Sequence, residues 1–429
     1  MWPDFPANLV AFKIVNAGLL AANGLLAAEL VRTRLRSRAV ANTIGIVTVL
    51  SVPLMVLSAL VLSEMLFLAL VLSALLLLER VIDAPGNARR AALAGFVIGL
   101  AMLVRSHGVV LLPAGLAILL ARREWRTSGI IVLATAVTIA PWQVWGAMHQ
   151  SVLPAPLAGN YGSYTAWWWR GYSDMGLSMI SETIARTTHE LGVMLLALFS
   201  PRPTFVAHAL TAICLVILIA FGLVQSARRS PVLATFLAGY LLIVIVWPFN
   251  PSRFVWGIWP LLLFLLGAAI HSLRYQPTRP VQLVLAFASA WIVMGYGAYE
   301  FRAWRGTWWH SIPRSADRRI SEAINYARNA TRPDDLIAAD DEGAIYLYSG
   351  RMSVPVASFT AQHYLVSRSA ELEAQQGLVP LLRMFPVRSV LVGSERTFDA
   401  AVALTKPPAP TLALRIQYPS GAAFTVLKQ

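Results

Sequence analysis

The chain has 429 residues, of which 57% are apolar and 13% are charged. A water-soluble domain of this size cannot cover so much apolar surface, so the composition predicts a polytopic membrane protein. The excess of 35 Lys plus Arg over 21 Asp plus Glu does not indicate a nucleic-acid binder, because the arginines punctuate apolar runs and form no soluble basic patch. A single cysteine, Cys214, excludes an intrachain disulfide.

Ten apolar runs lie between charged clusters, and they predict ten membrane-spanning helices within residues 1–300. The runs are 8–31, 41–57, 63–78, 91–104, 108–121, 129–148, 204–224, 231–247, 254–273 and 281–299. Several are short for a span, which favours tilted or partly re-entrant helices.

Arginines distinguish the two sides of this domain, because every second loop is rich in them. These loops contain Arg32, Arg34, Arg36, Arg38, Arg80, Arg89, Arg90, Arg122, Arg123, Arg126, Arg228, Arg229, Arg274 and Arg279. The positive-inside rule makes that side cytoplasmic. Glu64, Arg105, His107, the loop 149–203 and all residues after 300 are then expected outside, which in a bacterium is the periplasmic face of the inner membrane.

Residues 301–429 change in character and predict a small extracytoplasmic α/β domain. Residues 314–332 have helical spacing, PDDLIAAD and VRSVLVG read as strands, and LEAQQGLVPLLRMF and 398–404 read as helices. TLALRIQYPSGAAFTVLK predicts a final hairpin.

Charged side chains at the outer ends of spans are the first candidates for a site, since charge near membrane depth is costly. Ser63 and Glu64 begin one span, where the acid either favours the helix dipole or meets a substrate, so Glu64 is a candidate catalytic residue and Ser63 a candidate substrate-binding residue. Arg105 and Arg253 are candidate phosphate ligands because a guanidinium fork matches phosphate oxygens, and lipid-facing snorkelling is the alternative. His107 is either a further site residue or a satisfied loop histidine.

Aromatic residues are concentrated in GNYGSYTAWWWRGYS, residues 159–173. Tryptophan and tyrosine favour the membrane interface, so an anchoring belt is the simpler interpretation. Sugar rings also stack on such side chains, which makes Tyr161, Tyr164, Trp168 and Arg170 candidate substrate-binding residues.

No metal or cofactor is expected. The sequence contains no phosphate-cradling glycine loop and no zinc-ligand spacing. The pairs Asp334, Asp335 and Asp340, Asp341 offer carboxylates to a divalent metal, but they flank a predicted strand as turn formers do.

Two segments carry a resemblance to a known family. LSALVLSEMLFLALVLSALLL followed by RRAALAGFVIGLAMLVRSHGVVLLPAGLAILLARREWR is similar to the membrane core of the GT-C glycosyltransferases, which include protein mannosyltransferases and the lipid A aminoarabinose transferase. The matching positions are Ser63, Glu64 and Arg105, together with Pro141, Trp142, Arg253 and Pro260 in APWQVWG and SRFVWGIWPLLLFLLG.

The resemblance implies transfer of a sugar from a polyprenyl-phosphate carrier to a lipid, glycan or protein acceptor at the outer face, with inversion at the anomeric carbon. It also implies an aspartate base in an outer loop that follows a first span. The acid nearest that position here is Asp4, whose setting differs from the family's acidic motif. The expectation is therefore a missing upstream span and loop, with an unusual N-out insertion or a catalytically inactive chain as alternatives.

Two further functions compete with the enzyme. A flippase or transporter for a lipid-linked sugar also needs many spans and outer cations, but transporters place ionisable groups near the bilayer midplane. Apart from Lys13, the charges of this chain lie at span ends. A non-catalytic GT-C-like scaffold protein is the third interpretation.

Overall fold

The computed structural model describes residues 5–149, 152–275 and 278–427, and the chain forms two compact units. One, here called the membrane unit, comprises Leu9–Gln150 and Arg186–Ser311. The other, here called the sheet unit, comprises Met1–Asn8, Ser151–Ala185 and Ile312–Gln429. The segment Ser151–Ala185 thus groups with the C-terminal residues, although it lies between two membrane helices in the sequence.

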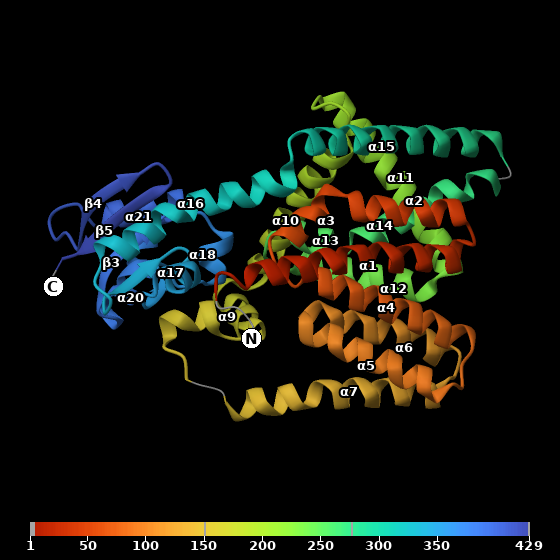
Figure 1. Ribbon diagram of the computed structural model, residues 1–429, viewed down its shortest axis with the longest axis horizontal. Coiled ribbons are helices and arrows are strands. Elements are labelled where there is room, and N and C mark those ends of the chain that lie inside the picture. Colours follow the sequence, from red (N-terminus) through yellow and green to blue (C-terminus); the bar gives the residue numbers. More distant parts are fainter. Residues whose placement is uncertain (1–4, 150–151, 276–277, 428–429) are drawn as a thin grey trace. The chain divides into compact units, whose positions relative to one another are not determined.

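The membrane unit is built from helices (Figure 1). They are α1 (Leu9–Leu35), α2 (Arg38–Leu50), α3 (Val52–Ala59), α4 (Glu64–Asp83), α5 (Ala88–Val104), α6 (Leu111–Ala121), α7 (Trp125–Met148), α11 (Phe205–Arg229), α12 (Pro231–Val246), α13 (Ser252–Trp256), α14 (Trp259–Ser272) and α15 (Arg279–Arg305), and most of α10 (Leu177–Phe199).

All ten expected spans are helical, and five have the length and apolarity of a complete span. Within the described residues these five are α1, α4, α7, α11 and α15, and the pair α2 and α3, bent by 45°, has the length and apolarity of a broken span or a re-entrant loop. The expected spans at 108–121, 231–247 and 254–273 correspond to shorter apolar helices. This is the arrangement of a polytopic helical membrane protein.

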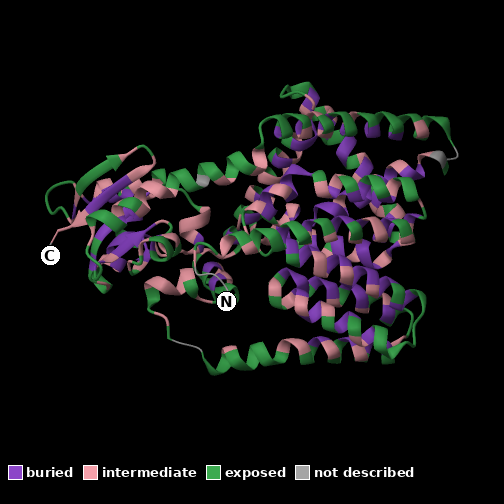
Figure 2. Cartoon of the chain, viewed as in Figure 1, coloured by how far each residue is buried: buried purple, intermediate pink, exposed green. Residues whose placement is uncertain are grey.

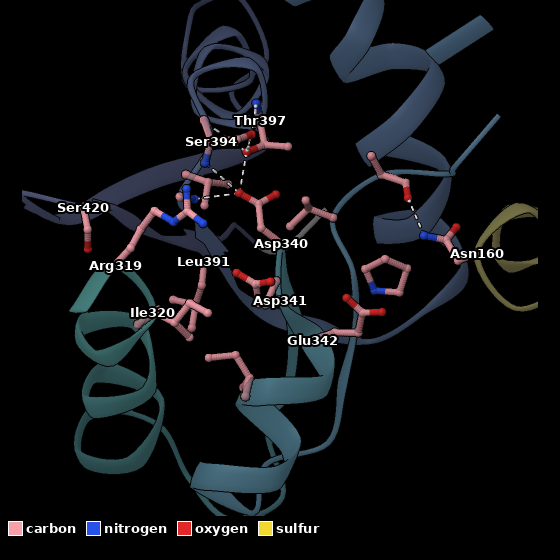
Figure 3. Close-up of a pocket in the computed structure, with 18 of the residues that line it drawn as sticks. Asn160, Arg319, Ile320, Asp340, Asp341, Glu342, Leu391, Ser394, Thr397 and Ser420 are labelled. Atoms are coloured by element: carbon pink, nitrogen blue, oxygen red, sulfur yellow. Dashed lines mark hydrogen bonds between the residues drawn. The ribbon is translucent and has the colours of Figure 1, made fainter. Parts of the chain in front are cut away.

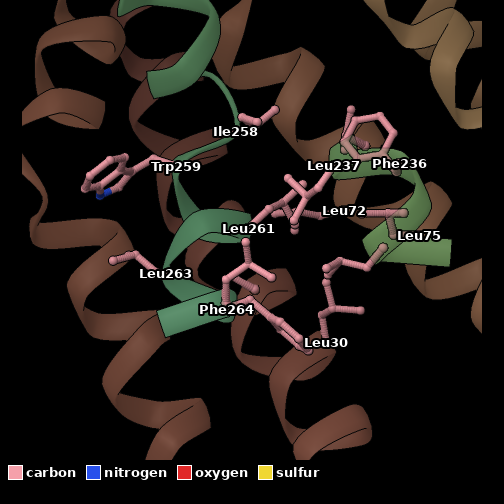
Figure 4. Close-up of a cluster of buried hydrophobic side chains, with 14 of the residues drawn as sticks. Leu30, Leu72, Leu75, Phe236, Leu237, Ile258, Trp259, Leu261, Leu263 and Phe264 are labelled. Atoms are coloured by element: carbon pink, nitrogen blue, oxygen red, sulfur yellow. The ribbon is translucent and has the colours of Figure 1, made fainter. Parts of the chain in front are cut away.

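Helix α4 lies at the centre of the membrane unit, and α7 lies at its edge. In the most apolar window of α4, 67% of the residues are buried, against 11% in α7. Figure 2 shows this contrast, and Figure 4 shows Leu72 and Leu75 of α4 packed with Phe236, Leu261 and Phe264. A helix that is apolar on all sides is buried in protein or faces lipid. The exposed apolar residues of α7 are therefore expected to face lipid.

Helices α1 and α2 approach closely at two glycines. A Cβ atom built on Gly24 or on Gly45 would lie 3.0 Å from the carbonyl oxygen of the other residue. Small residues at such crossings allow membrane helices to pack backbone to backbone, where association depends on van der Waals contact.

The sheet unit contains one five-stranded sheet in the order β2-β1-β3-β5-β4. Strands β1 (Leu336–Ala339), β2 (Ser353–Pro355) and β3 (Val387–Val392) are parallel. Strands β4 (Leu412–Tyr418) and β5 (Gly421–Val426) form the expected hairpin and join β3 in antiparallel register, with Val390 opposite Phe424.

The remaining helices of this unit flank the sheet or precede it. They are α8 (Ala158–Tyr161), α9 (Tyr164–Met175), most of α16 (Trp308–Ala330), α17 (Glu342–Ser349), α18 (Ala361–Leu365), α19 (Ala370–Glu373), α20 (Val379–Met384) and α21 (Glu395–Ala403). The predicted α/β character is confirmed, because buried Ala338, Val390 and Phe424 place apolar side chains of three strands in one core.

Candidate functional site

Glu64 is the first residue of α4 and its side chain is fully buried. The acid therefore lies where the helix dipole favours negative charge. Ser63 precedes it at the cap position, but its side chain is exposed and makes no capping hydrogen bond.

Arg105 reaches Glu64 from the next helix along the chain. It directly follows the last residue of α5, Val104, and its backbone is extended before the 3-10 turn Ser106–Val110. Its Nη1 lies 2.6 Å from Glu64 Oε1, and its guanidinium carbon lies 5.2 Å from the centre of the Phe254 ring. Only 14% of the Arg105 side chain is exposed, so this pair is largely shielded from water.

Arg253 reaches the same oxygen from a distant part of the sequence. Its Nη2 lies 2.6 Å and its Nε 2.8 Å from Glu64 Oε1, and 54% of its side chain is exposed. We call Glu64, Arg105 and Arg253 the paired-guanidinium cluster. Its formal charges sum to +1, and Glu64 Oε2 has no hydrogen-bond partner in the described part of the chain.

His107 lies beside this cluster, in the 3-10 turn Ser106–Val110, and is surrounded by aromatic side chains. Its ring stacks on Phe254 at 4.7 Å and meets Trp247 edge-on at 5.1 Å. The residue is buried, and its Nε2 has no hydrogen-bond partner among the described residues. His107 therefore helps to pack Phe254, which in turn lies under Arg105.

The predicted aromatic residues belong to the sheet unit. Ser163 caps helix α9 by accepting a hydrogen bond from the amide of Ala166, so Tyr164, Trp168 and Arg170 lie on a helix. Trp168 stacks on Tyr172 with ring centres 5.8 Å apart, whereas Tyr164 and Arg170 are exposed. These candidates belong to the sheet unit, whereas Glu64 belongs to the membrane unit, and their predicted role in substrate binding stays a prediction.

Tyr161 donates a hydrogen bond of 2.9 Å from its hydroxyl to Glu342 Oε1. Burial, followed by the hydrogen bond and charge of Glu342, raises the pKa of the Tyr161 hydroxyl to about 12. Trp167, which was not proposed as a site residue, is buried and donates from Nε1 to the carbonyl oxygen of Phe359. A tryptophan at this position therefore holds the segment to the sheet unit.

One carboxylate of each acidic pair accepts backbone hydrogen bonds, locally at Asp335 and from the distant start of α21 at Asp340. Asp335 Oδ2 accepts from the amide of Arg332 at 2.9 Å, and Asp340 Oδ2 accepts from the amides of Gly393 and Ser394. Within residues 5–149, 152–275 and 278–427, no three His, Cys, Asp or Glu side chains converge as metal ligands. Asp4 lies outside the described residues.

The fold and this cluster together define a polytopic helical membrane protein that places two cations on one buried carboxylate at a helix start. Residues 7–145, about a third of the chain, match the family described as dolichyl-phosphate-mannose-protein mannosyltransferase. The match extends from α1 into α7 and includes Glu64 and Arg105, and it confirms the resemblance of this part of the chain to GT-C membrane glycosyltransferases. No curated protein matches the chain significantly.

Proposed function

We propose that the membrane unit transfers a sugar from a polyprenyl-phosphate donor to a lipid, glycan or protein acceptor at the outer face of the inner membrane. The observation that carries this proposal is the convergence of Arg105 and Arg253 on the buried Glu64, across 189 positions in the sequence. The family match to residues 7–145 supports the reaction class.

The chemistry requires cations at the leaving group. An acceptor hydroxyl attacks the anomeric carbon, the bond from that carbon to the phosphate oxygen breaks, and the electron pair leaves with the polyprenyl phosphate. Preorganised guanidinium groups stabilise the charge that develops on this phosphate. The half-exposed Arg253 is accessible to the phosphate, whereas the more buried Arg105 acts from beneath it.

We assign a positioning role to Glu64. Its Oε1 accepts from both guanidinium groups, so the carboxylate holds two like charges close together that would otherwise repel. The proton of the acceptor hydroxyl needs a carboxylate base, and the resemblance implies an aspartate for that task. Glu64 is the less suitable base because its charge is already shared between two arginines.

The experiment measures transfer from radiolabelled polyprenyl-phosphate sugars in membranes that contain the wild type, Arg105→Ala, Arg253→Ala or Arg126→Ala. Arg126 is an exposed arginine of α7 outside the cluster and serves as the matched control. We expect a loss of about 10²-fold or more in turnover for the two cluster variants. Arg105→Lys, which keeps the charge but not the fork, tests whether a loss reflects phosphate geometry or a failure to fold.

Unchanged turnover in both alanine variants would remove the cluster from the site. Movement of the donor across vesicle membranes without transfer would instead favour the flippase. We also propose that the sheet unit is extracytoplasmic, and a reporter fused after residue 427 that is active only in the cytosol would refute this orientation.

A further inference from the structure

A cavity of about 410 Å³ opens in the sheet unit at the carboxyl ends of β1 and β3. Figure 3 shows side chains from α16, from the start of α17 and from the turn between β3 and α21 around this space. All the residues that line it belong to the sheet unit. Its volume falls within the range of about 300–1,000 Å³ that small-molecule sites occupy.

The sheet topology places this cavity where α/β proteins bind ligands. Strand β1 has parallel neighbours on both sides, because the chain passes from β1 through α17 to β2 and later returns to the opposite side as β3. The connections that leave the carboxyl ends of β1 and β3 therefore diverge. Such a switch point leaves a crevice outside the strand ends.

A phosphate is disfavoured in this crevice, because the chain fills the anion position with its own carboxylate. Asp340 Oδ2 accepts from the amides of Gly393 at 2.7 Å and Ser394 at 2.8 Å, and from Thr397 Oγ1 at 2.8 Å. These groups begin α21, and the start of a helix is where nucleotide-binding folds hold phosphate. A phosphate would have to displace Asp340 and would meet two further acids, Asp341 and Glu342.

The groups that remain are suited to hydroxyl groups. Arg319 of α16 and Asp341 line the cavity, and neither side chain makes a hydrogen bond to the described part of the chain. One offers donors and the other acceptors, while Ile320 and Leu391 supply an apolar surface beside them. Glu342 is held in place by the hydroxyl of Tyr161.

We propose that this cavity binds a neutral saccharide. Its hydroxyl groups accept from Arg319 and donate to Asp341 and Glu342, while a C–H face of the sugar ring packs on Ile320 and Leu391. The alternation of donors, acceptors and apolar surface matches a sugar ring, which presents hydroxyl groups at its edge and C–H bonds on its faces. The proposal concerns binding and does not depend on sugar transfer by the membrane unit.

The test titrates full-length protein in nanodiscs with mannobiose, maltose and cellobiose, and with inorganic phosphate and putrescine as charged probes, and follows binding by ligand-observed NMR. We expect at least one disaccharide to bind and neither charged probe to bind at the same concentration. Arg319→Ala and Asp341→Ala should each weaken disaccharide binding about tenfold or more, as expected for loss of a hydrogen bond to a charged group.

Asp334→Ala is the matched control, because Asp334 is an exposed acid of the same unit outside the cavity. It should leave disaccharide binding unchanged, and Arg319→Lys should restore part of the affinity that Arg319→Ala loses. The absence of binding by all three disaccharides would overturn the proposal. So would binding that neither alanine variant weakens, or preferential binding of phosphate or putrescine. Arg105→Ala should keep saccharide binding, which separates this result from a failure of the proposed transfer.

Discussion

Arg105 and Arg253 contact the same oxygen of Glu64, yet their removal should have unequal effects on stability. Glu64 is fully buried, and the exposed fractions of the two arginine side chains are 14% and 54%. Removing one partner of a buried pair costs about 3–5 kcal/mol, and an exposed pair contributes about 0–1 kcal/mol. Because Arg253 still contacts Glu64 in Arg105→Ala, we expect that variant to lower the free energy of unfolding by about 3 kcal/mol, the low end of this range. For Arg253→Ala we expect a loss of about 1 kcal/mol.

This difference of about 2 kcal/mol corresponds to roughly 30-fold in the unfolding equilibrium of the membrane unit. Cys214 provides the assay, since it is the single cysteine of the chain and lies 2% exposed in α11. A thiol reagent added in mild denaturant therefore labels the membrane unit only when that unit opens. We expect labelling to be fastest in Arg105→Ala, intermediate in Arg253→Ala, and unchanged in the control Arg126→Ala. Labelling of Arg253→Ala at least as fast as that of Arg105→Ala would refute the reasoning.

Three further predictions use the same two units. Glu79 of α4 is buried, accepts a hydrogen bond from Ser230 Oγ and lies 3.6 Å from Arg34. Glu79→Ala should therefore lower the free energy of unfolding of the membrane unit by about 3–5 kcal/mol and accelerate Cys214 labelling. Asp340→Ala leaves the donors at the start of α21 without their acceptor, so it should lower the free energy of unfolding of the sheet unit by about 1–3 kcal/mol. Hydrogen exchange of β1 and β3 measures this loss, and Cys214 labelling should not change. Burial and the nearby Asp340 carboxylate raise the pKa of Asp341, although the positive charge of Arg319 partly opposes this shift. Its contribution to stability is therefore lost as pH rises through that pKa, and Asp341→Asn should slow exchange in the sheet unit at pH 8 but not at pH 3. Equal exchange of wild type and variant at both pH values would contradict the sign.

The sequence was informative wherever the physical signal is local. Apolar runs predicted helices at all ten positions, because a residue in lipid or in a packed bundle must be apolar whatever its neighbours are. The segments VRSVLVG and TLALRIQYPSGAAFTVLK predicted β3 and the β4–β5 hairpin, and helical spacing predicted the C-terminal part of α16. No helix was expected within the connection 149–203, although Ser163 there is a capping residue that begins α9.

Position along the chain also identified Glu64, Arg105 and Arg253 as candidates, since a charge at the end of an apolar run has a cost that must be offset. It did not show that the three side chains meet at one carboxylate oxygen. That contact depends on where α4, α5 and α13 pack, and packing depends on the complementary shapes of residues far apart in the sequence.

The sequence by itself therefore determined that this is a helical membrane protein in a lipid environment. It also located the charges at the ends of the apolar runs, because both features follow from the transfer free energy of a short segment. Only the tertiary structure decided that Ser151–Ala185 joins the sheet unit and that the strand ends β1 and β3 enclose a cavity. Both depend on contacts between residues distant in the sequence, and no local pattern of hydrophobicity or charge encodes which distant partner a segment will meet.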